Sequence, residues 1–340
     1  MAYSDREWIL EGAAVHVSII GFDDGTDTNK MLDDQQVSSI NPNLTAGIDL
    51  TKARRLKENL EIAFQGPVKV GPFEISQHVA EEMLRLLNPH GKSNHEVIRP
   101  WVNGFDITHR SRGMWIIDFE EGMSEEMAAL YEAPFEYLKI NAKPKRLENR
   151  DSQRRTNWWR LGRSGYDLRI AVSSLKCFIV TPRVSKHRLF VWVPITTLPD
   201  SAVIAIARDD DYTFGVLHSR VHEVWALSMG TQLESRPRYT PTTTFETFPF
   251  PIASVDQRTK IGQAAKRLNE LREGWLNPPE SDIGPNELKQ RTLTNLYNER
   301  PTWLEMAHNT LDEVVLISYG WDKRLSAVQI LSRLLDLNLQ

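Results

Sequence analysis

The sequence predicts a mixed α/β fold of the α+β type, and three observations lead to this prediction. Short apolar runs rich in β-branched residues alternate with segments of helical spacing over residues 1–252. After residue 252, apolar residues recur at helical spacing between proline and glycine breaks. The chain has 340 residues, more than the roughly 100–200 of one average domain. We therefore expect two or three domains, of which the last is helical.

The elements of the first half follow from local patterns. Ser124 precedes a helix whose first turn holds Glu125 and Glu126, as a capped N-terminus requires. Pro144 is expected to break or kink a helix over residues 135–155. The other predicted elements are a strand over 13–22 with an Asp-Gly hairpin turn after it, an extended segment over 67–75, a helix over 78–87, a strand beginning at Ile98 or Trp101, and a strand over 114–119.

The second half begins with strands and ends with helices. The apolar runs predict strands over residues 177–181, 189–193 and 202–207. Residues 213–229 have the spacing of one helix, and proline punctuation predicts an extended chain over 230–251. The helical segments of the C-terminal region cover residues 256–276, 285–312 and 324–336.

Composition and charge exclude several classes of protein. Hydrophobic residues make up 41% of the chain and charged residues 25%, which is globular and not disordered composition. No apolar run approaches the roughly 18 residues that span a bilayer, and the N-terminus lacks a signal-peptide pattern. Cys177 is the only cysteine, which excludes an internal disulfide and a cysteine-rich zinc site. We therefore expect a cytoplasmic protein with no membrane partner.

A basic block lies within an otherwise acidic chain. Residues 139–188 contain fourteen Lys or Arg against three acids, a local charge of +11. Because the whole chain has a net charge of −4, the other residues sum to −15. Such a localised excess of cations favours a nucleic-acid contact, and a solvated charged face has the same composition.

Known catalytic and nucleotide-binding motifs are absent. The sequence contains neither G-x-G-x-x-G nor G-x-x-x-x-G-K-[ST]. Asn277-Pro278-Pro279-Glu280 differs from the Asn-Pro-Pro-aromatic signature of amino-group DNA methyltransferases, since Glu cannot stack on a flipped-out base. We interpret it as a link between two surface helices and predict no catalytic residue in this chain.

Two groups of residues could indicate a metal site. His218 and His222 stand four apart on a predicted helix, so their imidazoles share a face, but neither H-E-x-x-H nor H-x-x-E-H occurs. Three aspartates, Asp209–Asp211, precede the same helix without a nuclease-like Glu-x-Lys after Asp200. We interpret the histidines as core or interface residues and the aspartates as a solvated turn, and predict no metal.

Aromatic and polar side chains near the basic block could contact nucleic acid. Trp158 and Trp159 adjoin arginines, an arrangement that can stack on bases, although tryptophan more commonly packs into a core. Glu234 and Arg236 are two residues apart, so in an extended segment their side chains share a face. Glu accepts from cytosine and Arg donates to guanine, so the two could contact one base pair; an exposed ion pair has the same spacing.

Five motifs in a fixed order resemble one family. They are RPWVNGFD at residues 99–106, TPRVS at 181–185, FGVLHS at 214–219, WA at 225–226, and RYTPTTTFETFPFP at 238–251. Together they resemble the C-terminal part of MmeI-like Type IIL restriction–modification enzymes and related phage-defence N6-adenine DNA methyltransferases. The resemblance implies a protein that recognises double-stranded DNA by its sequence.

The resemblance also implies three domains. Residues 1–98 would be the late part of a methyltransferase-like domain with a remnant of its sheet, 99–252 the target recognition domain, and 253–340 a helical C-terminal domain. The family's S-adenosylmethionine loop and its Asn-Pro-Pro-aromatic motif would lie upstream. We therefore expect S-adenosylmethionine to bind not this chain but a missing methyltransferase domain or subunit, with this chain a truncation or one half of a split system.

The residues expected to contact DNA form two sets. Family positions that contact bases match Arg183, Ser201, Ala202, Glu234 and Arg236, with the best match at the last two. The basic block is expected to contact the DNA backbone through Lys143, Lys145, Arg146, Arg154, Arg155, Arg160, Arg163, Lys186 and Arg188.

Two other functions stay open at this point. The chain could be a self-contained metal-dependent hydrolase or nuclease that uses His218, His222 or the aspartate run, which would require a bound transition metal. It could also be a protein-interaction subunit whose basic block meets an acidic partner. A preference for one DNA sequence would exclude the second function.

Overall fold

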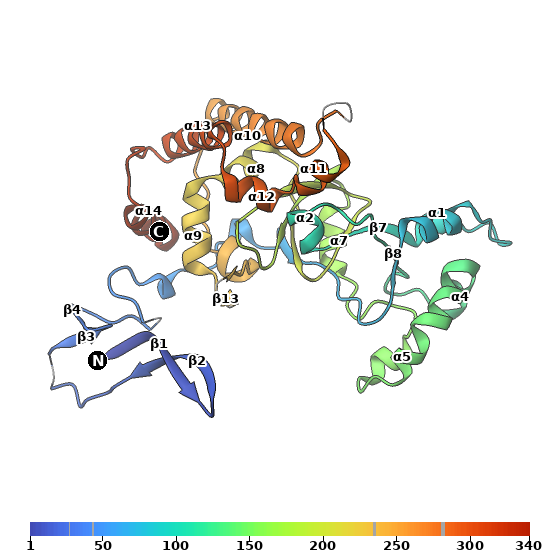
Figure 1. The fold of residues 1–340 in the computed structure, drawn as a ribbon, viewed down its shortest axis with the longest axis horizontal. Coiled ribbons are helices and arrows are strands. Elements are labelled where there is room, and N and C mark those ends of the chain that lie inside the picture. Colours follow the sequence, from blue (N-terminus) through green and yellow to red (C-terminus); the bar gives the residue numbers. More distant parts are fainter. Residues whose placement is uncertain (27, 43, 234–235, 280–282) are drawn as a thin grey trace. The chain divides into compact units, whose positions relative to one another are not determined.

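The computed structural model describes the whole chain except residues 27, 43, 234–235 and 280–282 (Figure 1). It consists of two compact units, one formed by Met1–Arg54 with Arg324–Gln340 and the other by Arg55–Lys323. Both units contain strands and helices, so the predicted mixed α/β class is confirmed.

The smaller unit is built on a four-stranded sheet with the order β2-β1-β3-β4. Its strands are β1 (Ala2–Leu10), β2 (Ala13–Ile20), β3 (Lys30–Leu32) and β4 (Gln35–Val37). Glu11 and Gly12, both with positive φ, form the two-residue turn that joins β1 to β2. The strand predicted over 13–22 is confirmed, but the Asp-Gly turn after it makes no hairpin, because β3 pairs with β1 and leaves β2 at the edge.

Two helical segments complete this unit. The 3₁₀ turn η1 (Leu50–Lys52) is followed by Arg54, whose backbone N–H and C=O both bond to the Asn338 side chain, at 2.7 and 2.8 Å. Asn338 lies on α14 (Ala327–Leu339), the helix predicted over 324–336. The Ser326 hydroxyl and the Gln329 side chain cap this helix reciprocally, which explains why it begins where it does.

The larger unit has one antiparallel sheet with the order β10-β9-β12-β5. Its strands are β5 (Ala63–Gln65), β9 (Cys177–Pro182), β10 (Val191–Pro194) and β12 (Val203–Ile206). Phe178, Val180 and Val203 pack against Leu168 and Val172 of α7 (Tyr166–Val172). The three apolar strands predicted after residue 176 are thus confirmed. Because β5 pairs with β12, segments before and after residue 98 share this sheet within one compact unit. The domain boundaries implied by the resemblance stay a prediction.

A second sheet, with the order β11-β7-β8-β6, lies in the same unit. Its strands are β6 (Glu74–Ile75), β7 (Ile98–Val102), β8 (Trp115–Ile117) and β11 (Leu198–Pro199). The helices α1 (Gln77–Arg85), α3 (Glu125–Ala129) and α4 (Glu132–Asn141) contribute residues to the core around it. The predicted helix over 78–87 and the cap at Ser124 are confirmed, since the Ser124 hydroxyl accepts from Met127 N at 3.2 Å.

Both tryptophans of the basic block belong to this second core. Trp158 and Trp159 are only 3% and 5% exposed, and their rings meet edge to face. The indole N–H of Trp158 donates to Glu125 Oε1, and that of Trp159 donates to the Met123 carbonyl, both at 3.0 Å. Their burial confirms the core interpretation and makes neither ring available for stacking on a base.

The basic block starts as three short helices and not as one. After α4 come α5 (Lys143–Leu147) and α6 (Ser152–Thr156). Pro144 lies in the first turn of α5, where its missing N–H costs no hydrogen bond. The helix predicted over 135–155 is therefore interrupted, as the proline indicated, and the interruption begins just before Pro144.

The segment predicted as one helix over 213–229 is two helices, α8 (Asp211–His218) and α9 (Arg220–Met229). Ser219 separates them, because its hydroxyl accepts from His222 N and so begins a new helix. Asp210 caps α8 through Thr213 N at 2.7 Å, which agrees with a turn at the aspartate run.

The C-terminal helices of this unit are α10 (Val255–Leu276), α11 (Pro285–Gln290), α12 (Leu293–Glu299) and α13 (Thr302–Ser318). Figure 1 shows α10 and α13 side by side, and α8 packs against α10. Gly215 permits that approach, since a Cβ there would lie 2.8 Å from Ile261 Cγ2.

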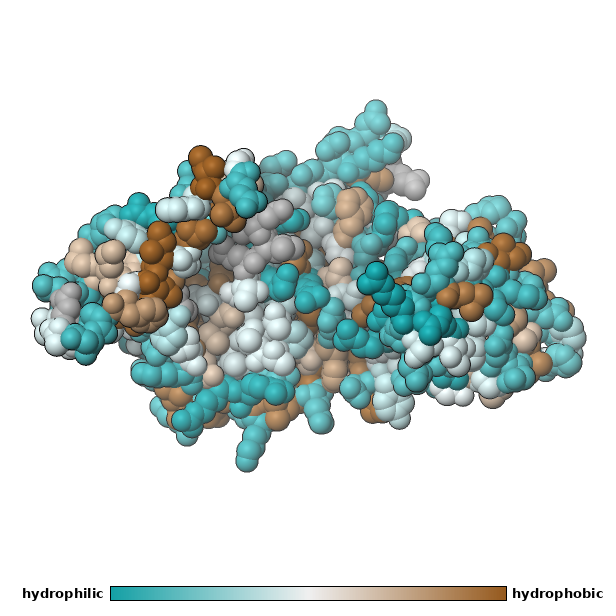
Figure 2. Space-filling view, turned by 90° about the horizontal axis from the view of Figure 1, so that it is seen from below, coloured by the Kyte–Doolittle hydropathy of each residue, from teal (hydrophilic) through white to brown (hydrophobic). Residues whose placement is uncertain are grey.

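Hydrophilic residues cover most of the face drawn in Figure 2, with hydrophobic ones in small groups. Among the described residues, no helix combines the length and apolar character that crossing a bilayer requires.

Candidate nucleic-acid interface

A hollow of about 480 Å³ lies between the end of β9 and the start of the short helix α2 (Gly104–Thr108). It is lined by Asn103, Gly104, Phe105, Thr108, Arg183, Val184, Ser201, Ala202 and Arg238. Three of the five predicted base-contacting residues, Arg183, Ser201 and Ala202, are therefore brought together here from two separate loops.

Backbone hydrogen bonds fix the position of Arg183. Its N–H donates to the Ala202 carbonyl at 2.8 Å, and its own carbonyl accepts from Tyr239 N at 2.7 Å. A Cβ on Gly104 would lie 3.4 Å from the Ala202 oxygen, so α2 also approaches this point closely. The Arg183 side chain thus starts from a backbone that is held on both sides.

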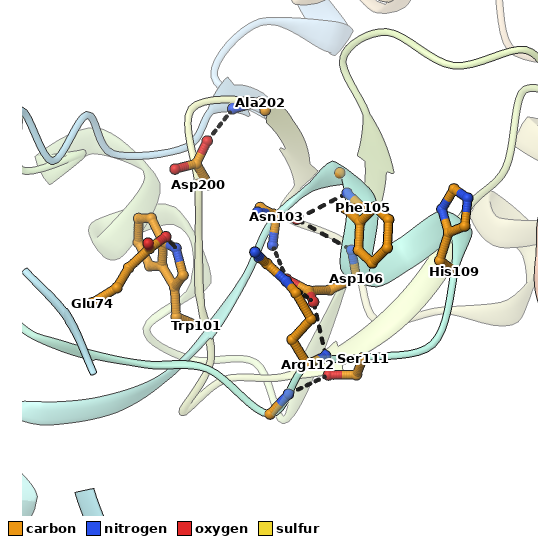
Figure 3. A network of polar contacts seen from close by, with 12 residues as sticks. Glu74, Trp101, Asn103, Phe105, Asp106, His109, Ser111, Arg112, Asp200 and Ala202 are labelled. Carbon is orange, nitrogen blue, oxygen red and sulfur yellow. Dashed lines mark hydrogen bonds and ion pairs between the residues drawn. The ribbon is translucent and has the colours of Figure 1, made fainter. Parts of the chain in front are cut away.

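The Asp200 carboxylate forms the turn that presents Ser201 and Ala202. Its Oδ1 accepts from Ala202 N at 2.7 Å and from Ser201 Oγ at 3.3 Å, as Figure 3 shows for Ala202. The Ser201 carbonyl accepts from Gln65 Nε2 at 2.8 Å, which ties the turn to β5. Ala202 is exposed and Ser201 partly so, and both are therefore accessible in the hollow.

The start of α2 is organised by a reciprocal cap. Asn103 Oδ1 accepts from Phe105 N at 2.8 Å and Asp106 N at 3.2 Å, while Asp106 Oδ2 accepts from Asn103 N at 3.1 Å. Arg112 then donates to both oxygens of Asp106, through Nε and Nη2, at 3.0 Å each (Figure 3). Burial alone would raise the pKa of Asp106, but the hydrogen bonds from Arg112 and from Asn103 N, together with the Arg112 charge, outweigh it and lower this pKa below its usual value.

We expect Asp106→Asn to destabilise the larger unit by about 1–2 kcal/mol at neutral pH, since it weakens charge-assisted bonds to a partly exposed arginine. A lowered pKa means that this stabilisation is complete above the unfolded-state pKa and disappears as pH falls through the folded-state value. Denaturant unfolding should therefore show the difference in free energy of unfolding between wild type and Asp106→Asn narrowing as the pH falls from about 5 through the unfolded-state pKa near 4 and the lowered folded-state pKa. A stability difference that stays constant with pH would contradict the assignment of this stabilisation to the Asp106 carboxylate. The control is Asp256→Asn, an exposed aspartate on α10, which should change the free energy of unfolding little.

Of the other two predicted base-contacting residues, Arg236 is described by the structure. Arg236 is exposed on β14 (Arg236–Pro237), which pairs with β13 (Gln232–Leu233). Glu234 is outside the described residues, so its pairing with Arg236 stays a prediction. The chain after β14 is joined to the hollow, because Val184 and Arg238 form an antiparallel bridge.

Most of the predicted phosphate-contacting cations lie at the surface. Lys145, Arg163 and Lys186 are exposed, and Lys143, Arg154, Arg155 and Arg160 are partly exposed. Several also have partners within the protein. Arg154 pairs with Asp151 at 3.2 Å, Arg160 donates to the Met123 carbonyl, and Lys186 donates to Asn298 Oδ1 at 2.6 Å.

The prediction of a phosphate contact is wrong for two arginines, because both are buried. Arg146 is 1% exposed, donates to the carbonyls of Lys69 and Arg160, and lies over the Phe73 ring. Arg188 is 8% exposed and donates to Thr181 Oγ1 and to the carbonyls of Pro182 and Pro237. Burial lowers the pKa of each to about 10, so both stay cationic at neutral pH, with guanidinium groups directed at the protein's own carbonyls.

His218 and His222 are buried in the core, as predicted. His222 Nε2 lies 2.9 Å from the Tyr239 hydroxyl, and His218 Nε2 lies 2.7 Å from Arg272 Nη1. Burial lowers the pKa of His222 to about 3 and that of His218 well below its usual value. In the part of the chain that the structure describes, no group of three or more His, Cys, Asp or Glu side chains could hold a metal ion.

Asn277 ends α10, and its Oδ1 accepts from Arg110 Nη1 at 3.1 Å. This agrees with our interpretation of the Asn-Pro-Pro segment as a link between α10 and α11. Glu280 lies outside the described residues.

Sequence reasoning missed part of the hollow. Phe105, Asp106, Arg112 and Arg238 were not among the predicted site residues, although they line or support it. The Asn-x-x-Asp spacing of residues 103–106 is a helix-cap signature and could have indicated a rigid helix start at this point.

The larger unit thus combines a mixed α/β fold with a hollow lined by two arginines and with C-terminal helices. Residues 69–252 match the model of the MmeI target recognition domain, more than half of the chain, and the chain belongs to this family.

Two relatives extend the comparison. DNA methyltransferase A of Bacillus subtilis (strain 168) is 25% identical over 217 residues, which are 60% of this chain and 23% of that protein. The structure of the Type IIL restriction–modification enzyme MmeI in complex with DNA has the same fold, with a TM-score of 0.75 and 20% identity over 99% of this chain and 45% of that one. This chain therefore spans less than half the length of either relative.

Proposed function

We propose that this chain is the part of a restriction–modification DNA methyltransferase that recognises a specific sequence in double-stranded DNA. The observation that carries the proposal is the meeting of Arg183, Ser201 and Ala202 in one hollow, on a domain of the MmeI target recognition family. Arg238 lines the same hollow and adds a second guanidinium to it.

The chemistry of these side chains suits the edges of base pairs. Arg183 would donate two hydrogen bonds to guanine O6 and N7, the commonest specific contact in the major groove. The Ser201 hydroxyl can donate or accept, and the Ala202 methyl can contact an apolar group. Arg236 would contact a base from β14, with Glu234 as its expected partner.

The exposed cations of the basic block would hold the DNA backbone and set its register. Such contacts position the protein on any duplex and carry no sequence information by themselves. The relatives support the choice of DNA, since one is called a DNA methyltransferase and the other is a restriction–modification enzyme seen in complex with DNA. A methyltransferase part outside this chain would bind S-adenosylmethionine and transfer its methyl group to adenine.

We expect the double substitution Lys145→Ala with Arg163→Ala to weaken binding to all duplexes. Both side chains are exposed, and each phosphate contact contributes about −0.9 to the slope of log affinity against log salt concentration. The double variant should therefore flatten that slope by up to about two units. Fluorescence anisotropy of a labelled duplex at several salt concentrations measures both quantities.

The matched control is Lys260→Ala with Arg267→Ala, two exposed cations on α10 that lie outside the basic block. This control should leave the slope unchanged. If wild type and the Lys145→Ala, Arg163→Ala variant have the same slope of log affinity against log salt concentration, these two residues do not contact the DNA backbone.

A further inference from the structure

Phe105 is an exposed aromatic residue in the hollow, and nothing in the proposed function yet uses it. It is 49% exposed and lines the hollow together with Arg183 and Ala202. The residue stands at the start of α2, where the cap formed by Asn103 and Asp106 fixes the backbone. An apolar side chain is thus presented from a rigid support among cationic and small polar neighbours.

Two side chains pack against the Phe105 ring. The His109 imidazole is stacked on it, with ring centroids 4.3 Å apart and planes within 1° of parallel. The Arg112 guanidinium lies over the ring at 5.6 Å from its centroid, and Figure 3 shows the phenyl ring between His109 and Arg112.

The two covering groups are themselves held in place. The Thr108 hydroxyl lies 2.8 Å from His109 Nδ1, and Asp106 binds the Arg112 guanidinium with both oxygens. The ring is therefore held in place, while about half of the residue's surface stays exposed. A fixed, half-exposed apolar ring is suited to contact with a small apolar group.

An apolar group in a site for base-pair edges has one natural counterpart in DNA. Thymine carries a C5-methyl group in the major groove, and phenylalanine is one of the side chains that contact it. Arg183 and Ser201, which share the hollow, would satisfy polar edges, so a fixed apolar group beside them adds discrimination that hydrogen bonds do not supply.

We propose that Phe105 is a specificity-determining residue that contacts the C5-methyl group of a thymine in the recognised sequence. The proposal rests on the proposed function, since it requires that the hollow faces the major groove. It assigns Phe105 to an A·T pair at one position of the site.

The test removes single methyl groups from the DNA. The sequence preferred by the chain is first selected from randomised duplexes, and each thymine of that sequence is then replaced in turn by deoxyuridine. Wild type should lose about fourfold in affinity at one position, the effect of one methyl group that is no longer buried. Phe105→Ala should bind the thymine and deoxyuridine duplexes equally, and Phe105→Leu should keep part of the discrimination.

Each other outcome overturns the inference. A recognised sequence without an A·T pair, or one in which no deoxyuridine weakens wild-type binding, excludes a methyl contact. If Phe105→Ala folds and keeps the wild-type preference for thymine over deoxyuridine, another residue makes the methyl contact. If Phe105→Ala does not fold, an unchanged preference in Phe105→Leu leads to the same conclusion. If wild type selects no sequence at all, the proposed function is wrong as well. If it selects a sequence but shows no methyl effect, only the inference about Phe105 is wrong.

Discussion

Replacing Arg272 by alanine is expected to lower the free energy of unfolding of the larger unit by about 3–5 kcal/mol. Arg272 lies on α10 and is 0% exposed. Its Nη2 donates to the Phe190 carbonyl at 2.9 Å, and its Nη1 lies 2.7 Å from His218 Nε2. The substitution leaves both acceptors buried without this partner and also creates a cavity.

The protonation state of His218 fits this arrangement. Its Nδ1 lies 3.0 Å from the Phe214 carbonyl and therefore carries the proton, so Nε2 accepts from Arg272. Burial, with the nearby Arg272 charge, keeps the pKa of His218 well below its usual value and the ring neutral. Arg272 thus links α10 to the chain between β9 and β10 and to α8.

Denaturant unfolding of the purified variant measures this effect. Arg267→Ala is the matched control, because Arg267 lies on the same helix and is mostly exposed, and it should change stability by no more than about 0.5 kcal/mol. Equal stabilities of Arg272→Ala and Arg267→Ala would show that the buried guanidinium does not hold the helical region to the sheet.

Replacing Arg183 by alanine is expected to remove the preference for guanine at a single position of the recognised sequence. A good bidentate contact discriminates by about 1–3 kcal/mol, or roughly 5- to 150-fold, against the wrong base pair. The Arg183 backbone is bonded to Ala202 and Tyr239 through main-chain atoms, which alanine retains. We therefore expect the fold to persist while the preference at that position disappears.

Competition binding with duplexes that differ at one base pair measures the preference. Arg183→Lys keeps the charge but not the planar fork, so it should lose most of the discrimination and retain much of the affinity. Lys145→Ala serves as the comparison, since loss of a phosphate contact weakens all sequences alike. Simultaneous loss at many positions would indicate that Arg183 supports the fold, and no change at any position would exclude it as a base contact.

The strands and caps of this protein could be predicted because their causes are local. The strand β9 is a nearly continuous apolar run, and Ser124 precedes a helix that it caps through its side chain. The break at Ser219 could not be predicted from periodicity, because Val221 and Trp225 continue the apolar face of α8 into α9.

In the basic block, the charge pattern alone does not tell which arginines are exposed and which are buried. Composition treats every arginine alike, yet Arg146 and Arg188 bind carbonyls of distant segments inside the protein, whereas Arg163 is exposed. The hollow was partly predictable through Arg183, Ser201 and Ala202, which the family resemblance implied as base-contacting positions. Phe105 could not be assigned from the sequence, because its proposed role depends on the packing of His109 and Arg112 against its ring.

The central claim is that the hollow around Arg183 recognises a DNA sequence, and selection of randomised duplexes by the purified chain tests it most directly. The account predicts enrichment of one defined sequence by wild type, with relaxation at one position when Arg183 is replaced by alanine. Binding that depends on salt but enriches no sequence would contradict the claim and reduce the chain to a non-specific cationic surface.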